Sequence, residues 1–387
     1  MTSERIYLDY AATTPVHEDV LAAMLPYFST LGYNPSSVHA EGRRAKAALD
    51  DARDRVARAL GASRKEITFT GGGTEADNQA ILGIAQTMRE RGRHIVSTAV
   101  EHHAVLHALD SLAADGYDVT LLPVDERGVV DPAAFAAALR PDTILASVMY
   151  ANNEIGVVQP VSELAAIARA HGVLFHTDAV QAPGWLPLDV DDLGVDLLSL
   201  SAHKFYGPKG VGVLYAREGI PVPPLIHGGG QEFGRRSGTE NLAGIVGLAR
   251  ALEAAVAEQP RRAARAEAFR NRLEASLLEN VPDIRINGAG ARRLPNNLNL
   301  SIGGVDSEAL LVRFDLEGLA VSAGSACTSG VLEPSHVIEA LGIQPRWHQG
   351  VVRFSLGAAT TAEEIDRVID LVPGLIAELR SVASTPA

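Results

Sequence analysis

Lys204 lies where a nucleophilic amine could act, directly after the apolar run at residues 195–200. The run is short and aliphatic, which is typical of a buried parallel strand. Open α/β sheets bind their ligands at the carboxyl ends of such strands. A lysine that is partly desolvated there can lose its proton and form a Schiff base with an aldehyde. Lys204 is therefore a candidate attachment point for a carbonyl compound.

A Gly-rich turn, residues 71–74, follows another predicted strand and precedes a predicted helix. Glycines let the backbone approach a ligand, and a helix N-terminus favours an anion, so Gly73 and Thr74 could bind a phosphate group. The alternative is an ordinary strand-to-helix turn in which Thr74 caps the helix. The spacing matches neither a Walker loop nor a dinucleotide-binding fingerprint.

Two further strand ends carry polar side chains. Asp178 and Gln181 follow the strand at 173–178, where the carboxylate could pair with a protonated ring nitrogen of a cofactor or could cap a helix. His102 and His103 follow the strand at 94–99. Either ring could stack on a flat cofactor and move protons near neutral pH, although the commoner role of a histidine is structural.

Two candidates lie late in the chain. The only cysteine, Cys327, stands among small residues at 322–330. A free cysteine is usually buried and inert, but no neighbour here is apolar enough to bury it, which favours a reactive thiolate. Arg353 interrupts the β pattern of residues 351–355. It either reaches the edge of the sheet or clamps a carboxylate in bidentate fashion.

Taken together, these residues fit pyridoxal phosphate. Its aldehyde would take Lys204, and its ring nitrogen would take Asp178. Its phosphate would take Thr74 together with Ser201 and His203.

The elements that hold these residues alternate between strand and helix from residue 66 to residue 215, which predicts an α/β fold with a mostly parallel seven-stranded sheet. The predicted strands are 66–70, 94–99, 119–123, 143–150, 173–178, 197–201 and 212–215. The predicted helices before and between them are 16–28, 40–60, 75–91, 102–115, 132–139 and 161–171.

The regular alternation of strand and helix ends before about residue 240, where an Ala-rich stretch begins. An Ala-rich helix is expected to end at Pro260 and a second to run over 261–278. Strands at 297–301, 319–322 and 351–355 and helices at 334–341 and 361–380 predict a small α+β domain. We therefore predict a large domain at 16–250 and a small C-terminal domain at 251–387, which the N-terminal arm 1–15 joins and which carries Cys327.

Composition excludes several classes of protein. The 387 residues carry a net charge of −13 with no basic stripe, which argues against direct nucleic-acid binding. No apolar run is long enough for a membrane span and no signal-peptide core is present. A single cysteine permits no intrachain disulfide. We expect a cytoplasmic protein.

Ten longer motifs run in order along nearly the whole chain: LDYAATTP (8–15), YNPSSVH (33–39), FTGGGTEADN (69–78), EHHAVL (101–106), NNEIGVVQP (152–160), HTDAVQ (176–181), SAHKFYGPKG (201–210), HGGGQEFGRRSGTEN (227–241), SAGSACTSG (322–330) and VVRFSLG (351–357). They resemble the cysteine desulfurases of the class V aminotransferase family, in the long-loop branch that supplies sulfur for iron–sulfur clusters and tRNA thiolation. The resemblance implies a fold-type I pyridoxal phosphate transferase.

The resemblance also implies roles for matching residues. The catalytic residues would be Lys204, which carries the cofactor, Cys327, which attacks the substrate sulfur, and His102, which stacks on the ring and moves protons. The other cofactor ligands would be Asp178 at the ring nitrogen, Gln181 at the ring hydroxyl, and Asn153. The residues that bind the cofactor's phosphate would be Gly73, Thr74, Ser201, His203 and Thr239, the last from the other subunit of a homodimer. Asn153, Arg353 and Asn34 would bind the substrate.

The implied reaction converts L-cysteine to L-alanine and leaves a persulfide on Cys327, which passes its sulfur to acceptor proteins such as an iron–sulfur scaffold or a tRNA thiolase. No metal site is implied, apart from Cys327 as a possible iron–sulfur ligand. The alternatives are a selenocysteine lyase, or another class V lyase or aminotransferase, and a protein without catalysis that only binds sulfur-trafficking partners. A metal-dependent hydrolase would instead use His102, His103, His176, Asp178 and His203.

Overall fold

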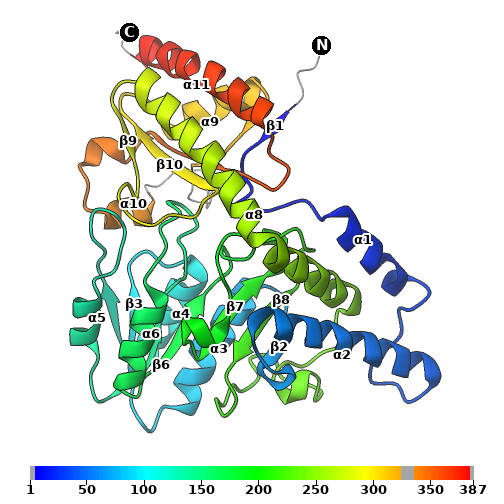
Figure 1. Cartoon of the computed structure of the whole chain (residues 1–387). Coiled ribbons are helices and arrows are strands. Elements are labelled where there is room, and N and C mark those ends of the chain that lie inside the picture. Colours follow the sequence, from blue (N-terminus) through cyan, green and yellow to red (C-terminus); the bar gives the residue numbers. More distant parts are fainter. Residues whose placement is uncertain (1–4, 324–334, 384–387) are drawn as a thin grey trace.

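A seven-stranded sheet forms the centre of the larger part of the molecule (Figure 1). The structure is a computed structural model, and it describes residues 5–323 and 335–383. Across the sheet the strands are β2 (Ile67–Thr70), β8 (Gly212–Ala216), β7 (Leu197–Ser201), β6 (Leu174–Asp178), β5 (Thr143–Ser147), β3 (His94–Thr98) and β4 (Asp118–Leu122). Within this sheet only β8 runs antiparallel to its neighbours. The predicted mostly parallel seven-stranded sheet is confirmed.

Helices cover both faces of this sheet, so its central strands are buried on both sides, as their aliphatic sequences predict. Successive residues of β3 show the alternation: Ile95 packs in one core with α3 (Gly73–Thr87) and α4 (His103–Ala114). Val96 belongs to the core on the opposite face. That core also takes side chains from α2 (Ala40–Leu60), α5 (Pro132–Ala138), α6 (Val161–Ala170) and the short α7 (Val190–Leu193).

A third core lies in the part of the chain near both termini (Figure 1). Its antiparallel sheet has the order β12 (Val351–Ser355), β10 (Asn297–Ile302) and β9 (Ile284–Ile286). The helices α9 (Ser307–Leu316) and α11 (Ala362–Ala383) pack against each other beside it. The N-terminal arm contacts this part, because β1 (Ile6–Tyr7) pairs in parallel with β11 (Leu319–Ala320).

One helix, α8 (Leu242–Asn280), links the core around Val96 to this third core. The predicted break at Pro260 is therefore wrong. Figure 1 shows its first half beside α2 and its second half beside α11, and both contacts are close. Leu252 is buried in the core around Val96, and Leu273 is buried in the core near the termini. Burial on both sides of the proline outweighs the one backbone hydrogen bond that proline cannot donate. The predicted domain boundary at residue 250 falls inside this helix and stays a prediction.

Several shorter elements differ from expectation. The helix expected at 16–28 is α1 (Glu18–Met24) followed by a 3₁₀ turn (Leu25–Phe28), and the one expected at 334–341 is α10 (His336–Ala340). We did not predict β9 or α9 from the sequence, because β9 is short and α9 is weakly amphipathic. Among the described residues, no helix is long and apolar enough to cross a membrane.

Candidate active site

The carboxyl ends of β6 and β7 open into a cavity of about 410 Å³, which is within the usual size of a small-molecule site. The arm, the N-terminus of α3 and the loop before α4 supply its other walls. The sequence-predicted residues that the structure brings to this cavity are Gly73, Thr74, His102, His103, Asn153, Asp178, Gln181, Ser201, His203, Lys204 and Arg353.

Lys204 follows β7 in a short 3₁₀ turn, and its amine points to the N-terminal arm. Its Nζ donates hydrogen bonds to the carbonyl oxygens of Ala11 (2.6 Å) and Ala12 (2.8 Å). Desolvation, helped by the positive charge of Arg353, lowers the pKa of Lys204 to about 8, against the opposing influence of Asp178. A usable fraction of the amine is therefore neutral near physiological pH, as a nucleophile or base must be.

Asp178 ends β6 and lies deep in the cavity, where its Oδ1 accepts a hydrogen bond from the backbone N–H of Val180 (2.9 Å). A second buried carboxyl, Asp77 of α3, also faces the cavity, and within the described part of the chain its Oδ1 has no hydrogen-bond partner. Burial raises the pKa of both groups, and their mutual repulsion raises that of Asp77 further. A cationic ring nitrogen would relieve this repulsion, so the acidic floor fits a pyridinium ligand.

His102 is the N-cap of α4 and also lines the cavity. Its Nδ1 accepts the backbone N–H of Ala104 (3.1 Å), so the neutral ring carries its proton on Nε2. Desolvation lowers the pKa of His102, and Asp178 opposes this shift. The ring is therefore a neutral group near pH 7 that can exchange a proton through Nε2, and the structural and functional interpretations of this histidine are compatible.

The phosphate-binding prediction rests on the N-terminus of α3, where Thr74 is the second helical residue and Gly72 is the N-cap. The alternative in which Thr74 caps the helix is therefore wrong. The first-turn N–H groups, the Thr74 hydroxyl and Ser201 line a second opening of the same region, which Lys209 also reaches. This donor set suits a phosphate. A Cβ on Gly73 would lie 2.8 Å from the Val180 side chain, so the close approach of helix and strand needs glycine there.

His203 and Gln181 take up places between the arm and the cavity. His203 Nδ1 is 3.1 Å from the Thr13 hydroxyl, and desolvation together with Lys204 lowers the pKa of this ring to about 4. It is therefore neutral and able to hydrogen-bond an anion. Gln181 Nε2 donates to the carbonyl oxygen of Ala11 (3.1 Å).

Arg353 is buried in β12, so the alternative in which it reaches the sheet edge is wrong. Its guanidinium donates to the backbone oxygen of Asn153 (2.8 Å) and to the carboxylate of Asp9 (2.7 Å), while its Nε has no hydrogen-bond partner among the residues that the structure describes. Asp9 thus occupies the kind of position that a substrate carboxylate would take. One guanidinium nitrogen thus binds a carboxylate, while the other binds a backbone carbonyl, so the bidentate clamp on a substrate carboxylate stays a prediction.

Two of the predicted residues that the structure describes are not brought to this cavity. Asn34 and Thr239 are exposed and line neither opening. Their roles, at the substrate and in the partner subunit's site, stay predictions. Cys327 lies outside the described residues, although Ser322, shortly before it, lines the cavity.

Sequence reasoning missed several cavity residues, including Asp77, Glu154 and His336. Asp77 carried a signal that could have found it, because it falls among Ala76, Ala80 and Ile81 on the apolar face of α3. Glu154 and His336 come from loops and a short helix, where no periodicity marks the buried side.

The metal-hydrolase alternative does not fit this geometry. His176 lies inside the sheet, where its Nδ1 and Nε2 contact the hydroxyls of Ser147 (2.8 Å) and Ser199 (2.9 Å), and burial lowers its pKa to about 3. It does not line the cavity. In the described part of the chain, no group of three or more ligating side chains is arranged to hold a metal ion.

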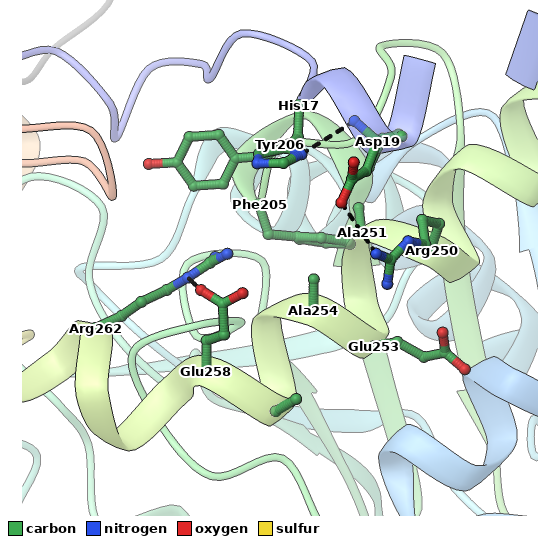
Figure 2. A pocket seen from close by; sticks show the side chains of 12 residues that line it. His17, Asp19, Phe205, Tyr206, Arg250, Ala251, Glu253, Ala254, Glu258 and Arg262 are labelled. Carbon is green, nitrogen blue, oxygen red and sulfur yellow. Dashed lines mark hydrogen bonds and ion pairs between the residues drawn. The ribbon is translucent and has the colours of Figure 1, made fainter. Parts of the chain in front are cut away.

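A separate cleft of about 420 Å³ lies between α1 and α8, next to the residues that follow Lys204 (Figure 2). Its charges pair with one another: Arg262 with Glu258 (3.0 Å), and Arg250 with Asp19 (3.1 Å). No predicted site residue lines it. The cleft therefore lies at a boundary between elements, and the described candidate residues gather instead in the cavity around Lys204.

Comparison with known proteins adds independent findings. The family model described as aminotransferase class V matches residues 6–368. The chain is 48% identical over 378 residues to a cysteine desulfurase IscS of Dictyoglomus turgidum, covering 98% of this chain and 96% of that protein. A solved NifS-like protein is similar in structure, with a TM-score of 0.91 and 39% identity over 97% of this chain and all of that one. A solved structure described as SspA in complex with cysteine has a TM-score of 0.81 and 38% identity, over 90% and 98% of the two chains.

Proposed function

This chain belongs to the class V aminotransferase family and is a cysteine desulfurase, and we propose that it releases L-alanine from L-cysteine while Cys327 takes up the sulfur as a persulfide. One observation carries the proposal. A lysine of lowered pKa, an acidic floor and a carboxylate-binding arginine meet at a single cavity: Lys204, Asp178 and Arg353. An α-amino acid with a thiol side chain presents the groups that complement them.

The family uses pyridoxal phosphate, and the donor set of this cavity suits it. Lys204 would hold the aldehyde and Asp178 the ring nitrogen. The N-terminus of α3 with Thr74 would hold the phosphate. When bound, the cofactor supplies an electron sink for the charge left by removal of the α-proton.

The residues of the chain do the remaining work. Arg353 binds the substrate carboxylate and thereby orients the α-carbon. Lys204 accepts the α-proton, for which its lowered pKa is suited, and His102 exchanges a proton through Nε2. The Cys327 thiolate then forms a sulfur–sulfur bond as the carbon–sulfur bond of the substrate breaks. The carbon side takes up a proton and leaves as alanine.

The short sequence separation between Ala323 and Cys327 supports the role that we propose for Cys327. Cys327 follows the buried Ala323 by four residues, so the two Cα atoms are at most about 14 Å apart. Ser322, one residue earlier, lines the cavity and pairs with the backbone of Arg353.

The finer statements are also proposals. The persulfide would pass to acceptor proteins that build iron–sulfur clusters or thiolate tRNA. The enzyme would act as a homodimer in which Thr239 reaches the partner's phosphate site, which agrees with its exposure here. A cytoplasmic location suits a single cysteine that must stay reduced to react.

Persulfide detection tests the function directly. After addition of L-cysteine to the holoenzyme, mass spectrometry of the alkylated protein should place one extra sulfur on Cys327. The Cys327→Ala variant should keep the cofactor's visible absorption and lose sulfide and alanine production. Alanine release at the full rate in that variant would contradict the proposal.

A further inference from the structure

Glu154 is a buried carboxyl that the reaction described above does not use. Only 3% of its surface is exposed, and its side chain lines the cavity next to Asn153. Its own backbone is held on both sides, because its N–H donates to Asn152 Oδ1 (2.8 Å) and its carbonyl oxygen accepts from Asn299 Nδ2 (3.1 Å). A carboxyl fixed so firmly in a cavity wall needs a partner.

That partner is Ser335, whose hydroxyl donates a hydrogen bond of 2.5 Å to Glu154 Oε2. Ser335 is also buried, and it caps α10 by accepting the N–H of Val337 (3.1 Å). Burial raises the pKa of Glu154, and the bond from Ser335 together with His336 and Arg353 opposes this shift. The hydroxyl therefore stabilises the carboxylate form.

His336, the residue after Ser335, makes further contacts with the wall of the cavity. His336 Nε2 lies 2.9 Å from the carbonyl oxygen of Glu101, and its ring centroid is 4.8 Å from that of His103. Val337 and Ile338 then pack in a core with Val100 and Met149 of the larger part. The chain that follows Cys327 is thus fixed to the cavity wall from its first described residue onward.

The described chain that precedes Cys327 is also held at this cavity, through Arg353. Ser322 and Arg353 exchange backbone hydrogen bonds, with Arg353 N donating over 2.6 Å. The Arg353 side chain binds the oxygen of Asn153, the residue before Glu154. Arg353 and Glu154 therefore connect the substrate-carboxylate site to both ends of the segment that carries Cys327.

We propose that Glu154 is a positioning residue for sulfur transfer: by holding Ser335, it fixes the far end of the Cys327 segment to the wall that binds the substrate. The proposal rests on the function proposed above. Loss of the contact would leave substrate binding intact and slow the attack of Cys327 on the substrate sulfur, because the distance of a nucleophile from its target sets its rate.

The test compares Glu154→Ala, Glu154→Gln, Ser335→Ala and Ser335→Thr holoenzymes in a single turnover with L-cysteine. One readout is the change in the cofactor's visible absorption, which reports substrate binding. The second is the rate of persulfide formation on Cys327. Ser307→Ala is the matched control, since Ser307 is likewise buried at the start of a helix with a bonded hydroxyl but lines no part of the cavity.

We expect Glu154→Ala and Ser335→Ala to slow persulfide formation by about 10-fold to 100-fold with an unchanged absorption response. The double variant Glu154→Ala/Ser335→Ala should be no slower than either single variant, because each single variant already removes the same contact. Glu154→Gln and Ser335→Thr keep an acceptor and a hydroxyl, so they should recover most of the rate, while Ser307→Ala should keep it.

Wild-type persulfide rates in Glu154→Ala and Ser335→Ala would overturn the proposal, as would an equal loss in Ser307→Ala. If Glu154→Ala does not fold, Ser335→Ala with its threonine rescue decides the same question. Failure of the proposed function gives a different result, because the wild-type enzyme would then form no persulfide.

Discussion

At the scale of single residues, Lys204 shows how the surroundings prepare a side chain for reaction. The arm carbonyls of Ala11 and Ala12 hold its Nζ at the cavity, while desolvation and the charge of Arg353 disfavour its protonated form. The first effect sets the position of the amine and the second sets its reactivity. Neither arises from the residues next to it in sequence.

The pKa of about 8 leads to a prediction for cofactor capture. Only the neutral amine adds to an aldehyde, so the rate at which the apoprotein binds pyridoxal phosphate should rise with pH with a midpoint near pH 8. Stopped-flow absorbance over a pH series measures this, with Lys204→Ala as the control that shows no covalent capture. A midpoint at the ordinary lysine pKa, about 10.4, would contradict the desolvated environment.

Arg353 supports a second prediction at this scale. Its fork contacts Asn153 and Asp9 at the same time, and an ammonium group cannot reproduce that geometry. Arg353→Lys should therefore raise the KM for L-cysteine by about 10-fold or more, with a smaller change in kcat. Steady-state kinetics measure both. Arg270→Lys is the control, because Arg270 is buried in α8 and bonds the backbone of Leu294 away from the cavity. An unchanged KM in Arg353→Lys would refute the clamp.

At the scale of elements, the sequence predicts strands and strand ends better than it predicts helix continuity. The strands of the main sheet are short aliphatic runs whose ends carry the polar residues, so both fold and site follow from local pattern. Pro260 is different, because its local rule predicts a break and the contacts of α8 with two separate cores override it. Glu154 and Ser335 lie 181 positions apart, and no local pattern connects them.

The exposed Pro260 offers a test of this account of α8. Pro260→Ala restores a backbone hydrogen bond to the carbonyl of Val256 and removes no buried contact. We expect the free energy of unfolding to rise by about 1–3 kcal/mol, measured as a higher urea midpoint at constant slope. A lower midpoint would mean that the proline shapes the helix so that it can reach both cores.

At the scale of the whole molecule, buried titratable groups under the active site tie stability to pH. Burial raises the pKa of Glu101 to about 8 and lowers that of His176 to about 3. The folded protein therefore keeps Glu101 protonated up to about pH 8, whereas the unfolded chain releases that proton near 4.5. The unfolded chain binds a proton on His176 below 6.5 that the folded protein binds only near 3.

The signs of the two effects are opposite, which locates the range of greatest stability. Where the folded protein holds the extra proton, stability falls as pH rises, so Glu101 costs stability between about pH 4.5 and 8. Where the unfolded chain holds it, stability falls as pH falls, so His176 costs stability between about 6.5 and 3. These two groups together favour the folded state most between about pH 4.5 and 6.5.

Glu101→Gln isolates the first effect. The glutamine oxygen can accept the hydrogen bonds that Glu101 receives from the Thr98 hydroxyl (2.7 Å) and the Met149 N–H (3.0 Å), and it carries no proton to lose. Relative to wild type, the variant should gain stability as pH rises from about 5 to 8, by at most about 1.4 kcal/mol per pH unit. Urea unfolding of both proteins at several pH values measures the difference. A difference that stays constant over this range would show that Glu101 is already ionised in the folded protein, so that a buried negative charge is held by the Thr98 hydroxyl and the Met149 N–H at neutral pH.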